Sequence, residues 1–261
     1  MDKTTLVGIV LGLVAVLVGM VLKWVAFSAL FNPAALLIIF VGTAASICIA
    51  FPWQTVKKVP ALLKIIFFNQ QQQDLRELIE QFTDWTELTR REGLLALETK
   101  IQESDDPFLN SGLQFAIDGQ TPEFIREVML EKVDAMEKRH AEGIALFSQA
   151  GTYAPTLGVL GAVIGLIAAL GNLEDMNVLG TAISAAFMAT LFGIFTGYVL
   201  WHPFANKLSE KSKREVHRME LMIEGILSIA SGDSPIVVKD KLSSHLTARE
   251  AAMLGEKSNE E

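Results

Sequence analysis

The most informative feature of this 261-residue sequence is where charge is lacking. Four long stretches contain no Asp, Glu, Lys or Arg, namely residues 4–22, 33–56, 143–173 and 176–206. About 20 apolar residues are enough to cross the hydrocarbon core of a bilayer, so a soluble globular enzyme is excluded. The sequence predicts an all-α polytopic membrane protein with four transmembrane helices and a large helical cytoplasmic insert between the second helix and the third.

Cysteine and positive charge are also scarce. The single cysteine, Cys48, lies in the second apolar stretch, so neither a disulfide framework nor a cysteine-based metal site is expected. The formal net charge of −8 argues against a nucleic-acid partner, because phosphate binding needs clustered Lys and Arg. The histidines form no HExxH or Ser/His/Asp arrangement, so we expect no enzyme, no metal and no other cofactor. They are scattered at His140, His202, His217 and His245.

Basic residues beside the apolar stretches predict the orientation in the membrane. Lysines at 57, 58 and 64 follow the second stretch and basic residues at 207, 211, 213 and 214 follow the fourth, whereas the short connections carry one lysine between them. Lys and Arg beside membrane spans are concentrated on the cytoplasmic side. We therefore expect a multi-pass protein of the cytoplasmic (inner) membrane with both termini in the cytoplasm. The predicted division is a hairpin over 1–53 (spans about 4–22 and 33–53), a cytoplasmic helical domain over 54–147, a second hairpin over 148–202 (spans about 148–172 and 178–202), and a cytoplasmic helix and tail over 203–261.

Helical periodicity continues through the polar regions. Thr121-Pro122-Glu123 is a strong helix start, and nothing breaks the pattern before Pro155, so the third span should be the end of a long helix. The fourth span should likewise run on into the cytoplasm. The other expected features are an interfacial helix over 54–68 interrupted near Pro60, helical spacing over 74–101, a short helix over 107–117, a stop at 232–235, and a frayed tail after about residue 248.

The predicted spans contain no acidic or basic side chain. Proteins that move ions across membranes normally carry an ionisable group there. Either this chain moves no ions, or a partner supplies the carboxylate. Span three has no hydroxyl between Leu157 and Gly171, and because a desolvated Na⁺ needs several oxygen ligands, this small supply favours protons.

Small residues and two prolines mark the third and fourth spans. Pro155 and Pro203 bracket the pair and predict a mobile joint between the membrane and cytoplasmic parts. Small residues let helices approach closely, either within one subunit or between chains, and their presence on both spans favours packing against another subunit or a guest helix. They are Gly151, Gly158, Gly161 and Gly165 in span three, and Ala185, Ala189, Gly193 and Gly197 in span four.

Several motifs together resemble the MotA/PomA flagellar stator family, over nearly the whole chain to about residue 246. They are Thr89-Arg90-Arg91-Glu92-Gly93-Leu94-Leu95-Ala96-Leu97-Glu98, Ile117-Asp118-Gly119, Tyr153-Ala154-Pro155-Thr156-Leu157-Gly158, and Thr190-Leu191-Phe192-Gly193 followed by Pro203. The resemblance implies a ring of subunits, as a homopentamer, around MotB-type single-span partners that each bring an essential Asp. It also implies torque on the rotor protein FliG.

The resemblance also implies roles for individual residues. Pro155 and Pro203 match the family prolines tied to torque, with Thr156 beside the first on the ion path. Thr190 matches the family Thr near the partner's Asp. At the span-three position where sodium-driven relatives typically have Thr, this chain has Ala162, which favours protons as the coupling ion over Na⁺.

The family's rotor-contacting charged pair matches Arg90 and Glu98, with Arg91 adjacent. On a continuous helix the two would lie about 80° apart around the axis and could share an exposed face without bonding each other. From the residues alone, this charged stretch could equally be a solvated surface.

Three alternatives remain at this point. One is a proton-driven energiser like ExbB and TolQ, although those relatives typically have three spans and an outside amino terminus. A second is a sodium-driven stator of the PomA type. A third is a scaffold or receptor that moves no ions, in which the glycines serve assembly alone.

Overall fold

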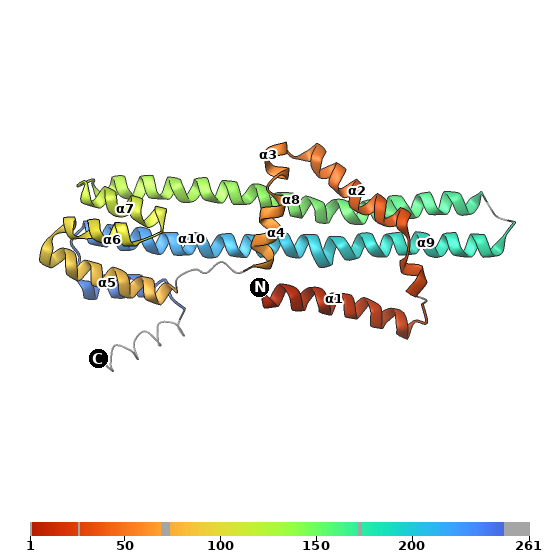
Figure 1. Cartoon of the computed structure of the whole chain (residues 1–261), viewed down its shortest axis with the longest axis horizontal. Helices are drawn as coiled ribbons and strands as arrows, with labels where there is room; N and C mark the ends of the chain where they lie inside the picture. Colours follow the sequence, from red (N-terminus) through yellow and green to blue (C-terminus); the bar gives the residue numbers. More distant parts are fainter. Residues whose placement is uncertain (1, 26, 69–73, 172–173, 248–261) are drawn as a thin grey trace. The chain divides into compact units, whose positions relative to one another are not determined.

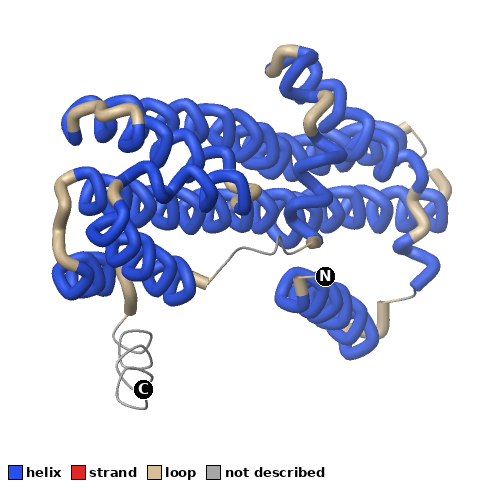
Figure 2. The backbone as a smooth tube through the Cα atoms, turned by 60° about the vertical axis from the view of Figure 1, so that its left-hand side comes forward, coloured by secondary structure: helices blue, strands red, loops and turns tan. Residues whose placement is uncertain are grey.

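The computed structural model describes the chain apart from residues 1, 26, 69–73, 172–173 and 248–261. The described residues form helices and connecting turns with no strand, which confirms the all-α prediction (Figures 1 and 2). The tail that we expected to fray lies outside the described residues. The chain divides into two compact units, which we call the membrane unit (Met1–Gln70, Arg139–Glu210) and the polar unit (Gln71–Lys138, Lys211–Glu261).

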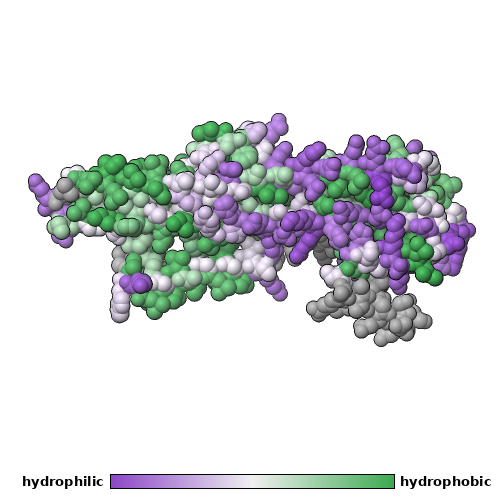
Figure 3. Space-filling model, turned by 180° about the vertical axis from the view of Figure 1, so that it is seen from behind, coloured by the Kyte–Doolittle hydropathy of each residue, from purple (hydrophilic) through white to green (hydrophobic). Residues whose placement is uncertain are grey.

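Within the described part of the chain, four helices are long and apolar enough to cross a membrane, as the sequence predicted. Hydrophobic residues gather over α1 and over the hairpin of α8 and α9 (Figure 3). The large helical insert follows the second of these helices, so the predicted fold class is confirmed. The helices are α1 (Lys3–Leu22), α2 (Pro33–Ala50), α8 (Pro122–Leu170), and one continuous helix made of α9 (Met176–Phe195), η3 (Thr196–Trp201) and α10 (His202–Ala230).

Side-chain caps fix where the apolar helices begin. The Asp2 carboxylate accepts a hydrogen bond from the backbone N–H of Thr4, and the Asn32 side chain accepts one from that of Ala35. Asp175 accepts from two backbone N–H groups at the start of α9. These caps satisfy donors that a helix start leaves free. Asn32 also donates from its amide nitrogen to the carbonyl oxygen of Ala185 at 3.1 Å, which ties the start of α2 to α9.

The small residues of α8 and α9 pack against each other within the chain. A Cβ atom on Gly158 would lie 2.8 Å from the carbonyl oxygen of Ala189 and 2.9 Å from the Cα of Gly193, so the two backbones touch. Gly161 and Gly165 face Ala189 and Ala186 less tightly, because a Cβ at either glycine would lie 3.4 Å from the alanine Cβ. These small residues therefore support close packing within one subunit, the other possibility that the sequence left open. Packing against another subunit or a guest helix stays a prediction.

Two short helices follow α2, namely α3 (Trp53–Val56) and α4 (Val59–Phe67). The predicted interruption is present, but it lies at residues 57–58, and Pro60 occupies the first turn of α4, where its missing N–H costs nothing. Leu62 packs against Gly143 of α8. A Cβ on Gly143 would lie 2.9 Å from Cδ1 of Leu62. Lys58 and Glu142 form an ion pair of 3.1 Å, so α4 is held to α8 by packing and by charge.

The polar unit is built around one hydrophobic core. Phe82, Leu113 and Met129 are fully buried there. A Cβ on Gly225 would lie 2.7 Å from the Phe82 ring, so the close approach requires glycine. The elements of this unit are α5 (Leu75–Glu92), η2 (Leu94–Ala96), α6 (Leu97–Glu103), α7 (Pro107–Ile117), the first part of α8, most of α10, and α11 (Pro235–Ser243).

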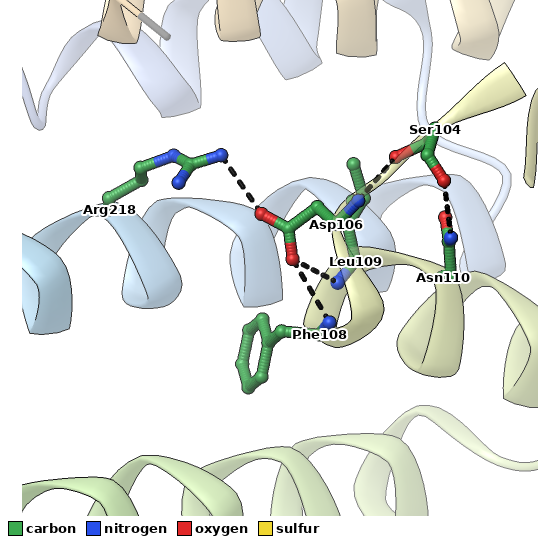
Figure 4. Close-up of polar contacts among 6 residues, drawn as sticks. All are labelled: Ser104, Asp106, Phe108, Leu109, Asn110 and Arg218. Atoms are coloured by element: carbon green, nitrogen blue, oxygen red, sulfur yellow. Dashed lines mark hydrogen bonds and ion pairs between the residues drawn. The ribbon is translucent and has the colours of Figure 1, made fainter. Parts of the chain in front are cut away.

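Asp106 joins two helices of the polar unit (Figure 4). One carboxylate oxygen accepts hydrogen bonds from the backbone N–H groups of Phe108 and Leu109 at 3.0 and 3.2 Å, capping α7. The other accepts from Arg218 of α10 at 2.9 Å. About four-fifths of both side chains is buried, so the charges are poorly screened by solvent. A single side chain thus fixes both the start of α7 and its position against α10.

Most boundaries predicted for the insert are confirmed. The short helix ends at Ile117, and Gly119 follows with a φ of +74°, while α8 begins at Pro122 and continues through Pro155. The continuous helix considered for Arg90 and Glu98 is wrong. Gly93 has a φ of +85° and ends α5, because this left-handed region is open to glycine and closed to most side chains.

Candidate functional site

The Pro155 ring of α8 lies against the backbone of η3, the segment that follows α9. A Cβ on Gly197 would be 2.7 Å from Cγ of Pro155 and 2.7 Å from the carbonyl oxygen of Gly151. Gly197 is therefore the position at which η3 can approach the proline of α8 this closely. The sequence placed Gly197 on a small-residue ridge but gave no sign of this specific contact. Pro155 therefore contacts the helix that carries Pro203, and the mobile joint between the membrane and cytoplasmic parts stays a prediction.

Pro203 lies two residues after the end of a π-helical turn, η3. The backbone N–H of His202 donates to the carbonyl oxygen of Gly197, five residues back rather than four. Proline has no N–H, so residue 203 cannot donate to the carbonyl of Val199. The wider π-helical turn therefore lies where the regular α-helical hydrogen bonding is already interrupted. π-helical turns within long helices are frequent at functional sites and at kinks. The sequence predicted a mobile joint from Pro155 and Pro203 but gave no sign of the π turn before Pro203.

The remaining candidate ion-path residues lie on α8 and α9. Ala162 and Thr190 are both half-buried, and each follows by one residue the contacting pair Gly161 and Ala189, so they lie at one level of the hairpin. The Thr190 hydroxyl donates to the carbonyl oxygen of Ala186 at 3.4 Å. Thr156 is exposed, and its hydroxyl donates to its own helix at 2.7 Å.

The charged candidates lie on either side of the turn at Gly93. Arg90 is in the last turn of α5 and Glu98 is in the first turn of α6, and both are exposed. Neither forms an ion pair among the described residues. Arg91 is paired with Glu87 on the same helix. The turn, rather than a helix face, decides how Arg90 and Glu98 are presented together.

All four histidines lie in the described part of the chain. His217 and His245 come together, with ring centroids 5.5 Å apart, and Nε2 of His217 lies 2.8 Å from the carbonyl oxygen of His245. No group of three or more potential metal ligands is present among the described residues.

Comparison with known proteins decides the family. The model of the MotA/TolQ/ExbB proton channel family matches residues 100–221. Motility protein A of Bacillus subtilis is 58% identical over the full length of both chains. The chain belongs to the MotA family. The predicted resemblance is thereby confirmed, and the chain is a MotA-type stator subunit and a multi-pass membrane protein.

Solved structures agree with this assignment. The flagellar MotAB stator complex of Bacillus subtilis contains a chain that matches with a TM-score of 0.92 and 59% identity, over 97% of this chain and 99% of that one. A chain of Campylobacter jejuni MotAB matches with a TM-score of 0.90 and 31% identity, over 95% and 97%. The match to MotA over the whole length favours a stator over an ExbB- or TolQ-like energiser.

Proposed function

We propose that this MotA-family chain forms a stator with a MotB-type single-span partner and converts proton flow into torque on FliG. The observation that carries the proposal is the full-length match to a chain of the Bacillus subtilis MotAB stator complex. The spans of this chain contain no carboxylate, so the essential Asp has to come from the partner. The partner's helix would then meet Ala162 and Thr190, which are half-buried at one level of the hairpin.

The coupling ion is a proton in this proposal. Ala162 offers no oxygen ligand, and the Thr190 hydroxyl donates to its own helix, which leaves few ligands for a desolvated Na⁺. Protonation of the partner's Asp would remove a charge from a low-dielectric site and so change its preferred position. The subunits, as a ring of five, would then step around the partner, with Pro155 and Pro203 at the joint. Both termini would lie in the cytoplasm.

The rotor contact would be made by Arg90, Arg91 and Glu98. Arg90 and Glu98 are exposed and remain available because they form no ion pair among the described residues. Leu95 lies between them in the sequence with 68% of its surface exposed, which adds an apolar contact to the charged ones. Charges of this kind steer association and lose effect as salt screens them.

The decisive experiment expresses this chain with Bacillus subtilis MotB in a strain of that bacterium lacking its stator genes. Tethered cells should rotate, stop when a protonophore is added, and keep rotating when sodium is removed. Rotation that needs sodium and survives loss of the proton gradient would contradict the proton assignment. Proton flux without rotation would favour an energiser, and absence of both with MotB present at normal levels would favour a scaffold.

The rotor contact is tested separately. Arg90→Glu should reduce rotation while proton flux through the complex is retained. Glu127→Gln, on an exposed position of α8, provides the control. Equal loss of flux and rotation in Arg90→Glu would count against a rotor contact at this position.

A further inference from the structure

The first apolar helix touches the rest of the membrane unit at few places. Within α1, only Met20 is buried. Its neighbours among the described elements of this unit include α4 and the π turn η3. Figure 1 shows the N-terminal end of α1 close to α4. Such sparse contacts give each of them a large share in positioning this helix.

One contact lies at the N-terminal end of α1. Oδ2 of Asp2 lies 2.7 Å from Nζ of Lys207 on α10, and Oδ1 of Asp2 accepts a hydrogen bond from the Thr4 hydroxyl at 2.7 Å. Nζ of Lys207 also donates to that hydroxyl at 3.0 Å. The backbone N–H of Asp2 donates to the carbonyl oxygen of Phe67 in α4 at 2.8 Å. Three elements of the membrane unit are therefore joined at one residue.

The ion pair at this end is well shielded. The side chain of Asp2 is 9% exposed and that of Lys207 is 29% exposed. Hydrogen bonds from the Lys207 ammonium and the Thr4 hydroxyl hold the pKa of the Asp2 carboxyl well below its ordinary value of 3.8, against the effect of burial. The Asp2 carboxyl is therefore ionised at neutral pH. Removal of one partner would leave the other charge poorly compensated.

A second contact lies higher on α1. A Cβ on Gly12 would be 2.7 Å from Cγ1 of Val199 in the π turn. Asp2 and Gly12 are separated by about 15 Å of helix, and Lys207 and Val199 by about 12 Å. The two contacts therefore match in spacing along antiparallel helices.

These contacts lie on opposite sides of Pro203. Val199 precedes the proline within η3, and Lys207 follows it by one helical turn. We propose that α1 is a brace across the Pro203 joint, with Asp2 and Lys207 as positioning residues at one end and Gly12 against Val199 at the other. A change in the bend at Pro203 has to move both ends of the brace or break one of them. The brace rests on the proposed function, because it sets how the joint turns ion flow into torque.

The test uses the full complex with MotB in tethered cells and separates torque per stator unit from the number of units. As stators join a motor, the rotation speed rises in steps. The height of a step gives the torque per unit, and the number of steps gives the number of units. Asp2→Asn and Lys207→Gln should each lower torque per unit by at least about twofold. The reversed pair, Asp2→Lys with Lys207→Asp, should recover most of that loss. Lys3→Gln, an exposed neighbour with no ion pair among the described residues, should match the wild type.

A second variant avoids the charges. Val199→Ala shortens the side chain that contacts Gly12 and should also lower torque per unit, whereas Val10→Ala, on an exposed position of α1, should not. The brace is overturned if the single variants keep wild-type torque per unit, if their loss is fully explained by fewer units, or if the reversed pair recovers nothing. A wild-type complex that does not rotate at all would instead count against the proposed function.

Discussion

Gly197 and Pro155 touch so closely that no side chain fits between them. A Cβ on Gly197 would lie 2.7 Å from Cγ and 2.8 Å from Cδ of the proline, and 2.7 Å from the carbonyl oxygen of Gly151. Neither the ring nor the backbone can give way as the end of a flexible side chain would. The contact joins the proline of α8 to the π turn that precedes Pro203. Pro155 is therefore in contact, through one glycine, with the helix segment that leads to Pro203.

Gly197→Ala should force α8 and η3 apart. Overpacking of a close contact costs about 1–3 kcal/mol, which exceeds the gain of up to about 1 kcal/mol from placing Ala in a helix. We expect a lower unfolding temperature of the purified complex and a loss of rotation. Gly180→Ala is the matched control on α9, because no heavy atom lies within 4 Å of its Cβ position. Equal behaviour of the two variants would show that the contact is unimportant.

Substitutions at Asp106 should separate its two roles. Asp106→Asn keeps a capping oxygen but loses the charge opposite Arg218, whereas Asp106→Ala loses both. We expect Asp106→Ala to destabilise the polar unit by about 2–4 kcal/mol, and Asp106→Asn by less. Hydrogen exchange of peptides covering α7 measures the effect. Asp105→Asn, on the exposed neighbour, is the control, and a change there as large as in Asp106→Ala would contradict the assignment.

Glu224 should make stability depend on pH in the acid range. Burial works against its ionisation, but Arg126 and Lys241, at 2.8 and 3.1 Å, lower its pKa below the ordinary 4.5. Because the pKa is lowered, the stabilisation is complete above about pH 5 and is lost as the pH falls below 4.5. Glu224→Gln should therefore lower the unfolding temperature at pH 7, and the difference from the wild type should shrink below pH 4.5. For Glu127→Gln, the difference in unfolding temperature from the wild type should not depend on pH in this way. The assignment is refuted if the difference for Glu224→Gln does not shrink below pH 4.5 either.

Gly93 should control how Arg90 and Glu98 are presented. Its φ of +85° and ψ of 169° lie in a region open essentially to glycine alone, so Gly93→Ala should cost about 1–3 kcal/mol or shift the turn. We expect reduced torque per stator unit with proton flux retained. Gly119→Ala changes a second glycine with a positive φ, +74°, at a different turn of the polar unit. Loss of torque per unit in both variants would point to general destabilisation rather than to the charged pair.

The sequence alone determined the membrane architecture and the helix boundaries set by local chemistry. Charge-free stretches of sufficient length predicted four spans, because a bilayer core excludes ionised side chains. Caps and glycines fixed local ends such as those of α7 and the start of α8, since these depend on neighbouring residues. The missing carboxylate was also visible, because an absence from the spans can be read from the sequence directly.

Only the tertiary structure decided which surfaces meet. The small residues of α8 and α9 could have packed within the chain or against another one, and periodicity is the same in both cases. The π turn before Pro203 and the contact of Gly197 with Pro155 depend on the position of a second helix. The pairing of Asp2 with Lys207 joins residues that are distant in the sequence. Such contacts form when packing brings distant segments together, and no local pattern records them.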